Sequence, residues 1–169
     1  QAEAGLISIT GTKNDPAKSS ISVADIAAGM YAYSGILTAL IRRTKTGEGS
    51  TIEVSMLEAL GEWMGFPLNY TMYGGVPPAR SGARHASIAP YGPFAGSDGE
   101  TVFLGLQNER EWPRFCEQVL DRPELSTDPR FDANAKRVDH REELESVIEE
   151  VFSSFTASEI VDRLDAAQI

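Results

Sequence analysis

The sequence has little cysteine and little histidine. Among its 169 residues there is one cysteine, Cys116, so an intramolecular disulfide and a cysteine-based metal cluster are both excluded. The two histidines, His85 and His140, lie far apart and form no helical pair at zinc-binding spacing, so we expect no bound metal. Sparse cysteine also favours a cytoplasmic protein, because thiols stay reduced there.

Basic residues are outnumbered as well. The chain has 15 Lys and Arg against 25 Asp and Glu, a net charge of −10. Residues 1–108 hold nine acids and seven bases, a net of −2, whereas residues 109–169 hold sixteen acids and eight bases, a net of −8. No basic run is present, so we expect no nucleic-acid partner. No apolar run of about 18 residues lacks polar interruption, which predicts no membrane span.

Residues 22–60 carry the most regular pattern. Residues 22–25 have the form of a helix capping box. Apolar side chains at helical spacing follow: Ile26, Met30, Tyr33, Leu37, Leu40 and Ile41. Gly47 ends this predicted helix, residues 51–54 predict a short strand, and a second helix follows. A helix, a glycine turn and a strand are half of an α/β unit, and the many small residues predict close packing.

The rest of the first half predicts a helical start over residues 1–6 and an extended run over residues 7–11. Residues 56–73 predict a long helix, and Pro67 is expected to kink it. The Gly-Gly-Val-Pro-Pro sequence at 74–78 indicates a boundary between structural parts.

The second half predicts a β-hairpin and several helices. Asp98-Gly99 between two apolar runs is a hairpin signal. Helices are expected over residues 109–120, with Asn108 as N-cap, over 139–153, and from a second capping box at 156–159. Cys116 falls among apolar side chains of the first of these helices and is interpreted as a buried structural thiol.

Three stretches together resemble the family III CoA transferases, a group that includes formyl-CoA and carnitine-CoA transferases and the α-methylacyl-CoA racemases. They are residues 22–29, residues 43–59, and Arg-Ser-Gly-Ala-Arg-His at 80–85 followed by Ala-Pro-Tyr-Gly-Pro-Phe at 89–94. The opening residues 1–6 are similar to the family as well. The resemblance covers essentially the whole chain, and the third stretch is closer to the transferases than to the racemases.

The resemblance implies an α/β fold and an interlocked homodimer. It assigns residues 1–60 to the end of a Rossmann-like large lobe, residues 61–78 to a linker helix, and residues 79–169 to a small α+β lobe with a β-hairpin and several helices. The chain begins without methionine and stops at Ile169 without a tail. We therefore interpret it as the middle fragment of a longer protein.

The resemblance also implies an activity, the movement of CoA between carboxylic acids through an aspartyl-CoA thioester. It places the nucleophilic aspartate just before Gln1, outside this chain, so the isolated fragment is expected to be inactive. The substrates would be an acyl-CoA and a carboxylic acid, with no permanently bound cofactor. Two alternatives stay open, namely a fragment of an α-methylacyl-CoA racemase and a non-catalytic α/β interaction module.

The candidate site residues follow from the same resemblance. Transferases of this family fold a glycine-rich loop over the acyl intermediate, and residues 80–85 lie where that loop belongs. We therefore expect substrate contacts from five residues of this region: Arg80, Gly82, Arg84, His85 and Tyr91. An arginine there could pair with a carboxylate of a dicarboxylic acyl group. Glu109, at a strand-to-helix junction like that of an acidic residue in the racemases, is the catalytic candidate. Asp25 is interpreted as a helix cap.

Overall fold

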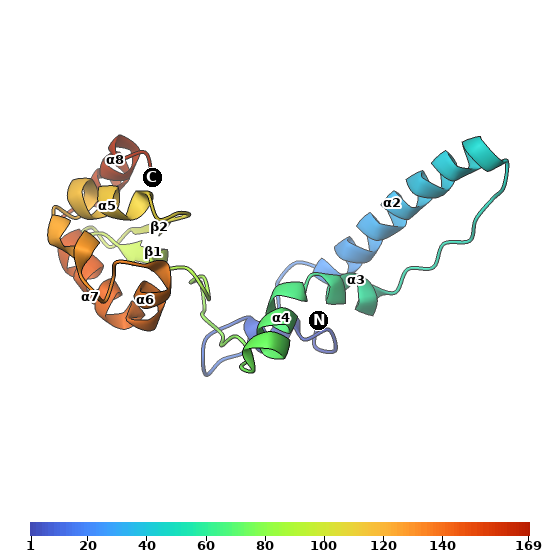
Figure 1. Ribbon diagram of the computed structural model, residues 1–169, viewed down its shortest axis with the longest axis horizontal. Helices are drawn as coiled ribbons and strands as arrows, with labels where there is room; N and C mark the ends of the chain where they lie inside the picture. The colour runs from blue at the N-terminus through green and yellow to red at the C-terminus, as the bar shows by residue number, and fades with distance from the viewer. The chain divides into compact units, whose positions relative to one another are not determined.

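The computed structural model describes residues 1–169 and divides them into two units, residues 1–82 and residues 83–169 (Figure 1). Unit 1 holds the helices α1 (Leu6–Ile9), α2 (Val23–Thr46), α3 (Met56–Glu62) and α4 (Gly65–Gly74). Unit 2 holds the strands β1 (Tyr91–Ala95) and β2 (Thr101–Gly105) and the helical segments α5 (Glu111–Arg114), η1 (Phe115–Val119), η2 (Pro123–Thr127), α6 (Asn134–Asp139), α7 (Arg141–Phe152) and α8 (Ala157–Ala166). The predicted α/β class is confirmed, and the predicted limits of large lobe, linker and small lobe stay a prediction.

Helix α2 realises the apolar spacing of residues 22–46. It ends at Gly47, which has a left-handed φ of 76° and donates its N–H to the Arg43 carbonyl, as the glycine turn predicts. The capping box predicted at residues 22–25 is wrong. Ser22 has φ −78° and ψ 62°, outside the extended conformation of an N-cap, and its side chain makes no cap hydrogen bond.

The strand predicted at residues 51–54 is also not formed. This segment is extended and runs back beside α2 (Figure 1), with the Ile52 side chain against Gly35, but it has no neighbouring strand. A strand needs the backbone hydrogen bonds of a partner, and among the described residues 1–169 the only paired strands are β1 and β2. The extended run predicted over residues 7–11 is wrong too, because α1 covers its first three residues.

Helix α2 is long and apolar enough to cross a membrane by length and composition alone. Its best 18-residue window has a mean hydropathy of 1.3, and 6% of that window is buried. The hydroxyls that interrupt it, those of Ser34 and Thr38, donate to carbonyls one turn back in the helix. A helix that packs inside a protein passes the same test, so the absence of a membrane partner stays a prediction.

The long helix predicted over residues 56–73 is two helices. Helix α3 begins at the N-cap Ser55, whose side chain accepts a hydrogen bond from the Glu58 amide, and ends at Glu62. Helix α4 begins at Gly65, so the break falls at residues 63–64 rather than at Pro67. Pro67 lies in the first turn of α4, where its missing N–H leaves no helical hydrogen bond unmade.

The β-hairpin of unit 2 forms where Asp98-Gly99 predicts it. Strands β1 and β2 pair antiparallel, with Phe94 opposite Val102 and Gly92 opposite Leu104. The Asp98 carboxylate accepts the amides of Glu100 and Ala157, so the turn is tied to the start of α8. Figure 1 shows the hairpin between α5 and α8 on one side and α6 and α7 on the other.

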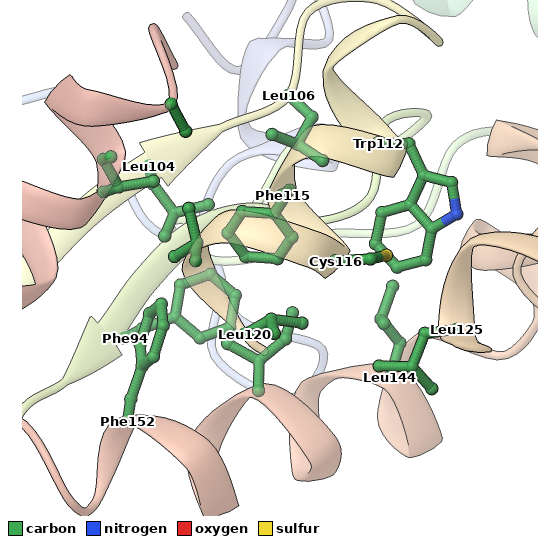
Figure 2. Packing of buried hydrophobic residues seen from close by; sticks show 14 of the residues in the cluster. Phe94, Leu104, Leu106, Trp112, Phe115, Cys116, Leu120, Leu125, Leu144 and Phe152 are labelled. Atoms are coloured by element: carbon green, nitrogen blue, oxygen red, sulfur yellow. The ribbon is translucent and has the colours of Figure 1, made fainter. Parts of the chain in front are cut away.

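A single apolar core holds unit 2 together (Figure 2). The inner face predicted for the helix after the hairpin is confirmed: Trp112, Phe115, Cys116, Val119 and Leu120 are all buried. That helix begins at Glu111 as α5 and continues as the π-helix η1. Asn108 is not its N-cap, because the Asn108 side chain accepts the amide of Arg110, which precedes the helix. The capping box at Thr156 and Glu159 is confirmed, with both reciprocal hydrogen bonds present.

The buried thiol of Cys116 is expected to be unreactive in the folded chain. It has no exposed surface, and burial raises its pKa to about 12, so the nucleophilic thiolate is scarce at neutral pH. We expect iodoacetamide to leave native Cys116 unmodified at pH 8 and to alkylate it fully in 8 M urea, as read by intact mass. Rapid alkylation of the native chain would contradict the buried position.

Candidate functional site

The predicted site residues fall in both units. Arg80 and Gly82 belong to unit 1, where they hold the loop that follows α1. The Arg80 guanidinium donates to the carbonyls of Thr12 at 2.9 Å and Lys13 at 3.2 Å. The Gly82 N–H donates to the Gly11 carbonyl at 2.8 Å, and its φ of 65° suits glycine. Both residues therefore contact backbone groups of unit 1 in this structure.

The segment of residues 83–91 opens unit 2 and is held by ion pairs. The Nε of Arg84 lies 2.7 Å from each carboxylate oxygen of Glu145 on α7. This hydrogen-bonded pairing raises the pKa of the Arg84 guanidinium. The stem of Arg84 also lies over Gly92, where a Cβ would come within 2.9 Å of it. Gly92 therefore lets Arg84 cross the first strand.

A second arginine, Arg141 of α7, supports the same segment. Arg141 donates through one Nη to the carbonyls of His85 at 2.8 Å and Ile88 at 3.1 Å. Its other Nη lies 3.7 Å from the Glu145 carboxylate, which is close enough for an ion pair but not for a hydrogen bond. Burial lowers the pKa of Arg141, partly offset by the attraction of Glu145. One carboxylate thus serves two arginines that position residues 84–88.

Helix α6 holds the far end of the segment through two side chains. Asn134 accepts the Ala89 amide and donates to the Ser87 carbonyl, at 3.1 and 2.8 Å. Arg137 is 2% exposed and donates to the carbonyls of Ala89 at 2.8 Å and Phe131 at 2.9 Å. Its guanidinium carbon lies 4.7 Å from the Trp112 ring centre, at cation–π distance.

Glu109 binds the two α6 residues that hold the segment, Asn134 and Arg137. One of its carboxylate oxygens accepts from Arg137 at 2.9 Å and the other from the Asn134 amide at 2.8 Å. Partial burial works to raise the pKa of Glu109, but these hydrogen bonds outweigh it and the pKa lies below its usual value. Both oxygens accept from protein donors, so this carboxylate is arranged to stay ionised. It borders a cavity of about 180 Å3 together with Asn134 and Arg137.

Three rings form a connected ledge on the hairpin. His85 lies 5.2 Å from Tyr91, centre to centre, and Tyr91 lies 5.8 Å from Phe103. Tyr91 lies flat over its cross-strand partner Gly105, where a Cβ would come within 2.5 Å of the ring. Any other residue at 105 would displace Tyr91. Phe103 is 59% exposed, so the ledge is open at that end.

A cavity of unit 1 has a different character. It measures about 360 Å3 beside α2 and is bordered by Tyr31, Ile52 and three carboxylates, those of Glu53, Glu58 and Glu62. No cation lines it. Carboxylates of the same sign oppose binding of an anion, so this cavity is poorly suited to a CoA thioester or a carboxylic acid.

The structure thus brings together Arg84, His85 and Tyr91 on one segment, with Glu109 tied to its far end through α6. It gives Arg80 and Gly82 contacts in unit 1 instead. Sequence reasoning missed the four side chains that hold the segment, namely Asn134, Arg137, Arg141 and Glu145. The one signal for them was an arginine-rich, acid-rich stretch, which also suits an ordinary solvated helix. The assignment of substrate contacts and of a catalytic role to the predicted residues stays a prediction.

Comparison with known proteins shows which sequences this chain is similar to. A sequence model described as CoA-transferase family III matches residues 1–169. The chain is 37% identical over 160 residues to an acyl-CoA transferase of Fusarium pseudograminearum, which covers 94% of this chain and 34% of that protein. It is 34% identical to the human succinyl-CoA:glutarate CoA-transferase, over 89% of this chain and 34% of that protein. It is 31% identical to the acetyl-CoA:oxalate CoA-transferase of Acetobacter aceti, over 100% of this chain and 43% of that protein.

Solved structures agree on the fold. A CaiB/BaiF family protein from Brucella suis superposes with a TM-score of 0.76 at 28% identity, over 100% of this chain and 44% of that one. A hypothetical protein from Mycobacterium tuberculosis gives a TM-score of 0.81 at 23% identity, over 99% and 44%. The chain spans less than half the length of these relatives. Because the family's sequence model matches every residue from 1 to 169, the chain belongs to CoA-transferase family III.

Proposed function

We propose that the protein containing this chain transfers CoA between carboxylic acids. The observation that carries this proposal is the match of the whole chain to CoA-transferase family III, together with 31–37% identity to three named CoA or acyl-CoA transferases. The names of the relatives favour transfer over racemisation. One relative is named for transfer from succinyl-CoA to glutarate, and another for transfer from acetyl-CoA to oxalate. Because both acceptors are dicarboxylic acids, we propose dicarboxylic substrates here.

The proposed mechanism uses an aspartate outside residues 1–169. Its carboxylate attacks the thioester carbonyl of the donor and expels CoA thiolate, which leaves a mixed anhydride. The thiolate then attacks the aspartyl carbonyl and releases the donor acid, giving an aspartyl-CoA thioester. The acceptor carboxylate attacks this thioester, and the thiolate finally attacks the acyl carbonyl of the new anhydride. Acyl-CoA leaves and the aspartate is restored, so no permanent cofactor is needed.

Residues of this chain would contribute to substrate binding. We keep Arg80, Gly82, Arg84, His85 and Tyr91 as proposed contacts. The two arginines already hold protein acceptors, so pairing either one with a substrate carboxylate requires an exchange of partners. Glu109 is kept as the proposed catalytic residue, although its two hydrogen bonds support a positioning role at least as well.

We also propose that the complete protein is a cytoplasmic, interlocked homodimer. Support comes from α2, whose large apolar side chains are 38–60% exposed while Ala27 alone is buried. Such a surface favours apolar cover, and the cover that we propose is the rest of the complete protein together with a second copy of it. Light scattering on the complete protein tests the dimer, and a monomer would contradict it.

The activity test compares the complete protein with the 169-residue chain. Each is incubated with succinyl-CoA and glutarate or oxalate, and the acyl-CoA products are separated by liquid chromatography and mass spectrometry. We expect glutaryl-CoA or oxalyl-CoA from the complete protein only, because the nucleophile lies outside residues 1–169.

Two outcomes would contradict the proposal. Sustained exchange by the 169-residue chain would place the nucleophile inside it. Failure of the complete protein to move CoA to any carboxylic acid, with exchange of the α-proton of an acyl-CoA in D2O, would favour the racemase alternative instead.

A further inference from the structure

The imidazole of His85 is held in one orientation by its own segment. The Ser87 amide N–H points at Nδ1 across 3.2 Å, and the Ser87 hydroxyl lies 3.4 Å from the same atom. The backbone of His85 is bonded on both sides, its N–H to the Tyr91 carbonyl and its carbonyl to Arg141. The ring lies 5.2 Å from that of Tyr91, centre to centre, with the two planes tilted by 49°. These contacts leave little freedom for the ring to turn.

This geometry decides which ring nitrogen carries the proton in the neutral imidazole. A backbone N–H can only donate, so Nδ1 must offer its lone pair to Ser87. The neutral ring then carries its hydrogen on Nε2. No atom of the described residues 1–169 accepts a hydrogen bond from Nε2, and the His85 side chain is partly exposed. His85 therefore presents a fixed N–H donor at its own end of the ledge.

We propose that His85 is a substrate-positioning donor, whose Nε2–H binds an oxygen of the acyl group or of the acceptor acid while Tyr91 and Phe103 support its carbon chain. This inference rests on the proposed function, because it takes the ligand to be a carboxylic acid or its thioester. The inference goes beyond the proposed function because it names the His85 atom that binds the substrate and the direction of its hydrogen bond. The same tautomer excludes Nε2 of the neutral ring as a proton acceptor, so His85 does not serve as a base through that atom.

The first test needs no activity. Long-range 1H–15N correlation spectra of the 169-residue chain at pH 8 distinguish the two neutral tautomers, and the chain has only one other histidine to assign. We expect His85 in the Nε2–H form. A spectrum showing the Nδ1–H form, or equal exchange between both, would overturn the proposal whatever the protein catalyses.

The second test separates the donor from the ring in the complete protein. His85→Phe keeps a ring against Tyr91 and removes the donor, whereas His85→Gln removes the ring and keeps an N–H donor at a similar reach. We expect kcat/KM for CoA transfer to fall about 10- to 100-fold in His85→Phe, because a hydrogen bond to a charged or developing oxyanion is lost. Because His85→Gln keeps a donor, it should recover at least half of that loss on a logarithmic scale.

The matched control is His140→Gln, since the His140 side chain is 41% exposed and pairs with Glu143 rather than with a ring of the ledge. It should leave kcat/KM within twofold. Comparing monocarboxylic and dicarboxylic acceptors identifies the bound oxygen. A loss confined to diacids assigns the distal carboxylate, and an equal loss for both assigns the thioester carbonyl. Wild-type rates in His85→Phe, with folding verified by its unfolding midpoint, would overturn the proposal. Absence of CoA transfer by the wild type would overturn the proposed function itself.

Discussion

Replacing Arg137 by alanine is expected to lower the unfolding free energy of unit 2 by about 3–5 kcal/mol. The substitution leaves two buried carbonyls, those of Ala89 and Phe131, without their donors. Each unpaired buried group costs about 1–3 kcal/mol. The cation–π contact with Trp112 is lost as well. The surviving partner, Glu109, is 56% exposed, so water can solvate it and its unpairing adds little.

Native-state hydrogen exchange of the slowest α7 amides measures this loss within unit 2, independently of unit 1. Lys136→Ala is the matched control, because it removes a cation from the same helix. Its pair with Asp132 is exposed and is worth about 0.3–0.5 kcal/mol. Arg137→Lys keeps the charge but cannot reach both carbonyls, and it reports an intermediate loss if the alanine variant does not fold. A loss for Arg137→Ala equal to that of Lys136→Ala would contradict the clamp on residues 87–89.

Truncating Phe152 to alanine is expected to destabilise unit 2 by a similar amount, about 3–5 kcal/mol. Phe152 has no exposed surface. Its ring makes edge-to-face contacts with Phe94 of the hairpin and Phe115 of the π-helix η1, at 6.0 and 6.5 Å (Figure 2). Phe152 therefore joins α7 to the hairpin through Phe94 and to η1 through Phe115. The loss combines transfer of the side chain to water with the cavity that rigid neighbours leave behind.

The control for this prediction is Phe103→Ala, which removes the same side chain from a position that is 59% exposed. We expect the control to cost less than half as much, because most of its surface is already in water. Phe152→Leu preserves much of the volume and should cost under about 1.5 kcal/mol, so it remains measurable if the alanine variant is unfolded. Equal losses at 152 and 103 would mean that the core shown in Figure 2 does not carry the stability of unit 2.

Features governed by neighbouring residues could be predicted from the sequence. The hairpin follows from Asp98-Gly99 between two apolar runs, and the second capping box follows from Thr156 and Glu159. The apolar face that includes Trp112 and Phe115 follows from helical spacing alone. Each depends on contacts within a few residues, so local chemistry is enough to define it.

Predictions failed where a residue's role depends on a partner or on backbone angles. Residues 51–54 have the composition of a strand, but a strand requires a neighbour to pair with. Residues 22–25 have the letters of a capping box, but the angles at Ser22 keep its hydroxyl away from the first turn. The helix break before α4 falls at residues 63–64 and not at Pro67, where the sequence predicted a kink.

By itself the sequence determined the α/β class and the family, and it predicted a candidate site at residues 80–94. Only the tertiary structure decided how that site is held. Arg84 meets Glu145 across 61 residues, and Asn134 and Arg137 meet Ala89 across 45 and 48. No local pattern marks such pairs, because each side chain alone resembles a solvated one on an acidic helix. Their roles arise only when packing removes water and leaves each donor with acceptors from the protein itself.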